Sequence, residues 1–81
     1  SDLSKVAKKE NKTQEALNYL LEGIERSKRI KPDELARMYY EILSLYSDLG
    51  DSKNSDEYLK KCKDLKNVSV DNLYKKMCDM K

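Results

Sequence analysis

The stretch YYEILSLYSDLGDSKNSDEYL, residues 39–59, decides how this chain is expected to fold. Its first half repeats apolar residues at the three- and four-residue spacing of one helix face, at Tyr39, Ile42, Leu43 and Tyr46. Gly50 then stands where a left-handed residue closes a helix, and Asp51 or Ser52 can cap the next helix. The stretch therefore predicts two helices joined by a tight turn.

Outside this hairpin the sequence predicts further helices. The polar run KKENK, residues 8–12, is expected to separate a helix over residues 2–10 from one that begins after Thr13. Pro32 suits only the first turn of a helix, so the next one should begin there. A last helix is expected from Ser69 to the chain end, with its apolar face formed by Val70, Leu73, Tyr74, Met77 and Met80. The predicted fold is all-α, with about five helices in antiparallel hairpins.

Composition excludes several classes of function. The 17 basic and 15 acidic residues are interspersed, whereas a nucleic-acid binder usually separates a basic face. No apolar run reaches the roughly 20 residues that a membrane span requires. The chain has no histidine, the usual general base near neutral pH, and its two cysteines lack metal-ligand spacing. We expect no enzyme activity, no cofactor or metal, and no nucleic-acid or membrane partner.

The central hairpin resembles the tetratricopeptide repeat, a helix-turn-helix unit with fixed large and small positions. The resemblance rests on the spacing of six residues: Tyr39, Ile42, Tyr46, Ser55, Leu59 and Cys62. The chain departs from the family pattern at Leu43, where glycine is usual, and at Asn67, where proline is usual.

The same spacing recurs along the chain. Shifted by 39 residues it falls on Leu3, Ser4, Ala7, Ala16, Leu20 and Gly23, and shifted by 35 it falls on Tyr74, Met77 and Cys78. The resemblance thus covers essentially the whole chain and implies one domain of hairpins stacked in a right-handed superhelix. Residues 1–31 would be a first repeat lacking its start, 32–67 a complete repeat, and 68–81 the first helix of a further repeat or a cap. We expect the chain to be part of a longer protein.

Tetratricopeptide arrays are generally protein-interaction scaffolds in which the first helix of each repeat lines a concave groove. The resemblance implies these groove positions: Ser1, Lys5 and Lys8; Arg37, Tyr40, Glu41, Ser44 and Asp48; and Asn72, Lys75 and Asp79, with Lys76 close by. Tyr40 is either a ligand contact or a partly buried filler of a wide helix face. The cations either form a basic groove for an acidic segment or are ordinary solvated charges.

Three kinds of partner follow from the resemblance. The leading one is a protein or peptide segment bound in the groove. The alternatives are self-association through exposed end faces, and a peptide-sensing region of a larger regulatory protein. Capture of a C-terminal carboxylate, as in one branch of the family, is not expected, because Glu41 and Lys5 stand where that branch has asparagines.

The resemblance to the repeat also predicts where the two cysteines lie. Cys62 and Cys78 occupy small-residue positions on helices that should be neighbours. We expect their sulfur atoms to lie near each other, as buried free thiols or as a disulfide if the Cα atoms come within about 7 Å.

Overall fold

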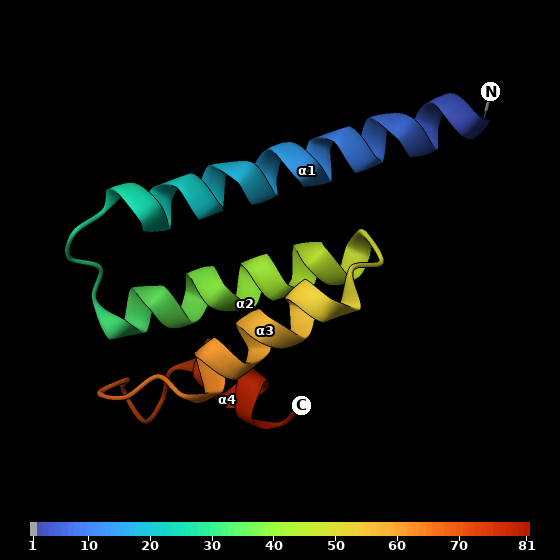
Figure 1. Cartoon of the computed structure of the whole chain (residues 1–81). Coiled ribbons are helices and arrows are strands. Elements are labelled where there is room, and N and C mark those ends of the chain that lie inside the picture. The colour runs from blue at the N-terminus through green and yellow to red at the C-terminus, as the bar shows by residue number, and fades with distance from the viewer. Residues whose placement is uncertain (1) are drawn as a thin grey trace.

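The computed structural model describes the backbone of residues 2–81 and the side chains of residues 11–81. Over that range the chain forms four helices and no strand: α1 (Asp2–Arg26), α2 (Pro32–Asp48), α3 (Ser52–Lys63) and α4 (Leu73–Asp79) (Figure 1). The all-α class is confirmed, and the expected count of about five helices is slightly too high. The right-handed superhelix and the division into residues 1–31, 32–67 and 68–81 stay predictions.

The missing fifth helix is explained by α1, which runs unbroken for 25 residues. The predicted separation at residues 8–12 and the predicted cap at Thr13 are therefore wrong. The run KKENK is polar, but it contains neither glycine nor proline, and lysine and glutamate are good helix formers. Polarity alone does not end a helix, so α1 passes through the run.

The boundaries of α2 lie close to those predicted. Pro32 is in the first turn, followed by Asp33 and Glu34, whose negative charges suit a helix N-terminus. After the C-cap residue Leu49, Gly50 adopts a φ of 77°, the left-handed conformation that glycine adopts without steric cost. Asp51 then caps α3 by accepting a hydrogen bond from the backbone N–H of Asn54.

The α2–α3 hairpin is closed by a small residue and a cluster of aromatic rings. Ser55 allows close approach, and its hydroxyl donates a 2.9 Å hydrogen bond to the carbonyl oxygen of Leu43. Tyr58 of α3 packs on two tyrosines of α2, with ring centroids 5.9 Å from Tyr39 and 5.8 Å from Tyr46. Burial raises the pKa of Tyr58, and likewise that of Tyr46.

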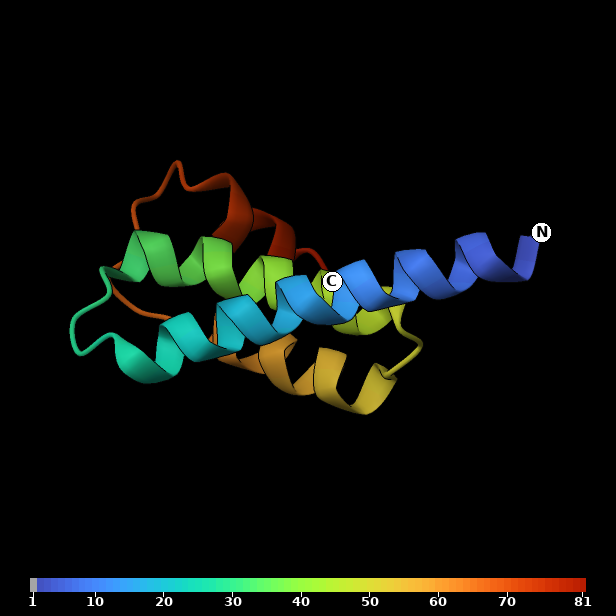
Figure 2. The same cartoon turned by 90° about the horizontal axis from the view of Figure 1, so that it is seen from above.

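Helix α2 is the centre of the arrangement, since it contacts each of the other three helices. By contrast, among the residues that the structure describes, α1 packs against α2 alone. The N-terminal turns of α1 extend past the α2–α3 turn, as both views show (Figures 1 and 2). The short α4 packs against both α2 and α3.

The start of α4 differs from the prediction. Its cap is Asn72, whose side-chain oxygen accepts hydrogen bonds from the N–H groups of Tyr74 and Lys75. Ser69 instead donates twice to the carboxylate of Asp33 in the first turn of α2, from its N–H (2.7 Å) and its hydroxyl (2.6 Å). This contact takes Ser69 away from the capping role and anchors the α3–α4 connection to α2.

The expected apolar face of the last helix is only partly correct. Tyr74 and Met77 are half-buried and Cys78 is fully buried. The other three are exposed: Val70 at 93%, Leu73 at 68% and Met80 at 85%. Val70 precedes the helix and Met80 follows it, so neither takes part in the helical periodicity.

Within the described residues, no helix combines the length and the apolar character needed to cross a membrane.

Candidate interaction groove

A hollow of about 450 Å³ opens between α1, α2 and α4. Three residues predicted for a groove border it together: Tyr40, Glu41 and Ser44. We call it the Tyr40–Tyr74 groove, and its full lining is Ala16, Leu20, Tyr40, Glu41, Ser44, Leu45 and Tyr74. Its volume is in the range of pockets that hold a small ligand or a few side chains of a peptide.

Two tyrosines form one wall of the groove. The rings of Tyr40 and Tyr74 lie 5.8 Å apart between centroids, tilted by 53°. Such a pair presents a broad apolar surface, and tyrosines lose little side-chain entropy on binding. The sequence left open whether Tyr40 contacts a ligand or fills a wide helix face. In the structure Tyr40 is half-buried: it packs on Tyr74 and also borders the groove.

The charges along α2 are arranged around Arg37. Its guanidinium donates to both carboxylate oxygens of Glu41 at 3.2 Å and also pairs with Glu34. The hydrogen bond with Glu34 is the main reason why the pKa of Arg37 lies above its usual range and that of Glu34 below. Arg37 is thus neutralised within the helix, and the Glu34–Arg37–Glu41 group keeps a net negative charge.

The next predicted residue along α2 lies in a neighbouring hollow. Asp48 is exposed and borders a space between α2, α3 and Lys81 that shares Ser44 with the Tyr40–Tyr74 groove. The predicted residues of α2 therefore follow one face of the helix, and its C-terminal half carries acidic rather than basic groups.

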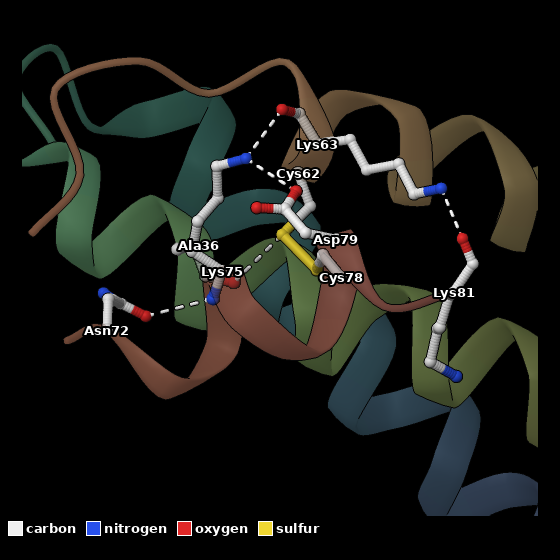
Figure 3. A network of polar contacts seen from close by, with 8 residues as sticks. All are labelled: Ala36, Cys62, Lys63, Asn72, Lys75, Cys78, Asp79 and Lys81. Carbon is white, nitrogen blue, oxygen red and sulfur yellow. Dashed lines mark hydrogen bonds and ion pairs between the residues drawn. A yellow bond between two sulfur atoms is a disulfide. The ribbon is translucent and has the colours of Figure 1, made fainter. Parts of the chain in front are cut away.

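The predicted residues of the last helix serve internal contacts. Asn72 caps α4 and donates from its amide to the carbonyl oxygen of Asp33. The ammonium of Lys75 donates to the carbonyl oxygen of Lys63 at 2.7 Å and pairs with Asp79 at 2.8 Å (Figure 3). Lys75 thereby satisfies a carbonyl at the C-terminal end of α3, where a cation is favoured. Lys76 is exposed.

Lys5 and Lys8 lie outside the residues whose side chains the structure describes, and their predicted groove contacts stay predictions.

A disulfide fixes the position of α4. Cys62 of α3 and Cys78 of α4 are bonded, with Cα atoms 6.1 Å apart and both residues fully buried (Figure 3). The sulfur of Cys62 also contacts the carbonyl oxygen of Ala36 in α2 at 3.9 Å. Of the two possibilities that the sequence left open, the structure thus shows the disulfide, and the expected proximity of the cysteines is confirmed.

The groove includes residues that sequence reasoning did not assign to it: Ala16, Leu20, Leu45 and Tyr74. Tyr74 was predicted as an apolar packing residue, and it does pack, but against Tyr40 at the groove edge. The order of the helices along the chain could have indicated the role of Tyr74. Because α3 folds back on α2, the helix that follows α3 can pack against both of them, and this places α4 beside α2.

In the described part of the chain, no three histidine, cysteine or acidic side chains come together in a way that could hold a metal ion.

Comparison with known proteins agrees with the hairpin geometry. Residues 36–68 match the family model of the tetratricopeptide repeat. No curated protein and no solved structure matches the chain significantly. The α2–α3 hairpin is therefore similar to a tetratricopeptide repeat, over the residues that the family model matches.

Proposed function

We propose that this chain is a protein–protein interaction module that binds a peptide or a partner segment in the Tyr40–Tyr74 groove. Tetratricopeptide repeats, to which the α2–α3 hairpin is similar, act generally as protein-interaction modules. The observation that carries the proposal is the convergence of Tyr40, Glu41 and Ser44 on one hollow beside Tyr74, since the resemblance to the repeat implies that all three face a ligand.

The lining of the groove indicates what kind of segment it would bind. Leu20, Leu45 and the two tyrosine rings offer apolar contact area, which favours an apolar side chain in the bound segment. Glu41 lies at the edge of the groove. On α2, the two carboxylates of Glu34 and Glu41 share the single positive charge of Arg37, so this edge keeps a negative charge. A lysine or arginine beside the apolar anchor would therefore be favoured, and a carboxylate there would be repelled.

Short synthetic peptides test the proposal. A library of such peptides is screened against the chain, and each binder is titrated against variants by fluorescence polarisation. Tyr40→Ala removes the shared wall of the groove, and Ser44→Arg fills the groove. Both should weaken binding by about tenfold or more, the usual loss when a hot-spot contact is removed.

Tyr19→Ala is the matched control. Tyr19 is 79% exposed on α1 and lies outside the groove lining, so this variant loses a tyrosine without changing the groove. Circular dichroism confirms that each variant keeps its helices. Binders that lose affinity equally for Tyr19→Ala, or that ignore both groove variants, would show that the groove is not the binding site.

A further inference from the structure

We propose that the Cys62–Cys78 disulfide is a redox switch for the Tyr40–Tyr74 groove. The groove is assembled while the two cysteines are bonded, and it comes apart when a reducing thiol cleaves the bond. Control of partner binding by this switch rests on the proposed function, whereas assembly of the groove does not.

The disulfide belongs to the core on which the groove wall packs. Cys62 and Cys78 form one buried cluster with Leu43, and Tyr40 is among the partly buried residues packed against that cluster. The bond joins α4 to α3, and the sulfur of Cys62 contacts the carbonyl oxygen of Ala36 in α2 (Figure 3). A change at the two sulfur atoms is therefore a change in the support of the Tyr40 ring.

Within α4, the bonded cysteine and the groove tyrosine lie on the same face. Tyr74 and Cys78 are four residues apart, which places them one helical turn from each other on one side of α4. The bond that holds Cys78 against α3 thus also fixes where the Tyr74 ring lies. That ring meets the ring of Tyr40 at 5.8 Å between centroids.

Little besides the disulfide holds α4 in place. Cys78 is the only fully buried residue of this helix. The hydrogen bonds that Asn72 and Lys75 donate to carbonyl oxygens of α2 and α3 are exposed. A helix of seven residues is not stable without tertiary contacts. Loss of the bond should therefore release α4 together with the groove wall that it carries.

The switching step is a thiol–disulfide exchange. A thiolate attacks one cysteine sulfur, which breaks the Cys62–Cys78 bond and forms a mixed disulfide, and a second thiolate then displaces the chain. Two reductant thiols thereby supply two electrons and two protons: the chain gains two thiol groups, and the reductant leaves as a disulfide. Because both cysteines are fully buried, the attack requires α4 to open locally.

Equilibration in glutathione buffers tests the switch without any partner. Free thiols are alkylated, and the bonded fraction is measured by mass. Tyr40→Ala removes an aromatic contact that α4 makes only in its closed position. The equilibrium constant for reduction by glutathione should therefore be about threefold to tenfold larger in this variant than in the unmodified chain.

Tyr19→Ala is the matched control, since Tyr19 is 79% exposed on α1 and lies outside the groove lining. Its equilibrium constant should equal that of the unmodified chain, and circular dichroism checks that both variants keep their helices. Equal constants for the unmodified chain and Tyr40→Ala would overturn the proposal, because the bond and the groove wall would then be independent. Equal shifts in the two tyrosine variants would overturn it as well.

Peptide titrations test whether the switch controls binding. Cysteine-free peptides that bind the oxidised chain are titrated again in dithiothreitol, where their affinity should fall by about tenfold or more, as it should for Tyr40→Ala. Cys62→Ala with Cys78→Ala should bind as weakly as the reduced chain and should not respond to dithiothreitol.

The two experiments separate the switch from the proposed function. Equal affinities of the oxidised and the reduced chain would refute the switch and leave the groove as the binding site. If no peptide binds even the oxidised chain, the proposed function alone fails, and the glutathione constants still decide whether the disulfide assembles the groove.

Discussion

The disulfide between Cys62 and Cys78 joins α4, the helix that carries Tyr74, to α3, and both of these helices pack against α2, which carries Tyr40. Helix α4 has seven residues, too few to be stable without tertiary contacts. The bond joins it to α3, and Lys75 and Asn72 add polar contacts at its N-terminal half. One wall of the Tyr40–Tyr74 groove thus depends on a covalent bond.

Reduction of this disulfide should destabilise the chain and release α4 first. The cysteines are 16 residues apart, and closing a loop of that size contributes roughly 3 kcal/mol to the free energy of unfolding. Hydrogen exchange at residues 73–79 should accelerate with reductant, while protection in α2 falls much less. Cys62→Ala with Cys78→Ala is the control, because reductant should have no effect on it. Equal urea midpoints of the native chain with and without reductant would contradict the prediction.

The hydroxyl of Ser55 should stabilise the hairpin. Ser55→Ala removes its hydrogen bond to the carbonyl oxygen of Leu43 and should lower the free energy of unfolding by about 1 kcal/mol. Ser55→Leu should cost more, about 1–3 kcal/mol, because a larger side chain forces α2 and α3 apart. Urea denaturation measures both. A leucine variant as stable as the alanine variant would show that close approach at this position is not required.

The two glycines should respond to alanine in opposite directions. Gly50 has a φ of 77°, so Gly50→Ala should cost about 1–2 kcal/mol, although no atom lies within 4 Å of the added Cβ. Gly23 lies within α1, and a Cβ there would meet Met38 at an ordinary 3.5 Å. Gly23→Ala should therefore stabilise the chain by about 0.5–1 kcal/mol through helix propensity. Thermal unfolding of the two variants shows whether each substitution raises or lowers the stability. A change in the same direction for both would refute this account of the turn.

The Asp33–Ser69 contact should make stability fall in acid. Hydrogen bonds from the Ser69 hydroxyl and N–H lower the pKa of Asp33 below its ordinary 3.8. The folded state therefore binds this proton less readily than the unfolded state, so the stabilisation is present above pH 3.8 and is lost as the pH falls below it. Asp33→Asn should reduce the stability at neutral pH and flatten its decline in acid.

Asp71→Asn is the matched control for this titration, since Asp71 is exposed in the same connection. Its stability should follow the pH dependence of the unmodified chain. An Asp33→Asn variant whose decline in acid is as steep as that of the control would contradict the assignment to Asp33.

Much of the central hairpin follows from short-range chemistry. Pro32 in a first turn, Gly50 in a left-handed conformation and Asp51 as a cap each act on backbone groups within a few residues. The spacing of Tyr39, Ile42 and Tyr46 predicts the buried face of α2 for a similar reason, since a helix places such residues on one side. These features were readable without tertiary structure, and so were three residues of the groove.

Only the tertiary structure decided the features that join distant segments. The sequence around Ser69 predicts a helix cap, but in the structure Ser69 donates its hydrogen bonds to Asp33, 36 residues earlier. The pairing of Tyr40 with Tyr74 and the bond between the cysteines depend on how α4 packs against α2 and α3. The sequence by itself determined the α2–α3 hairpin, because the helix face, the turn glycine Gly50 and the cap Asp51 act over a few residues. The groove depended on the tertiary structure, because its walls come from three helices whose approach is set by long-range packing.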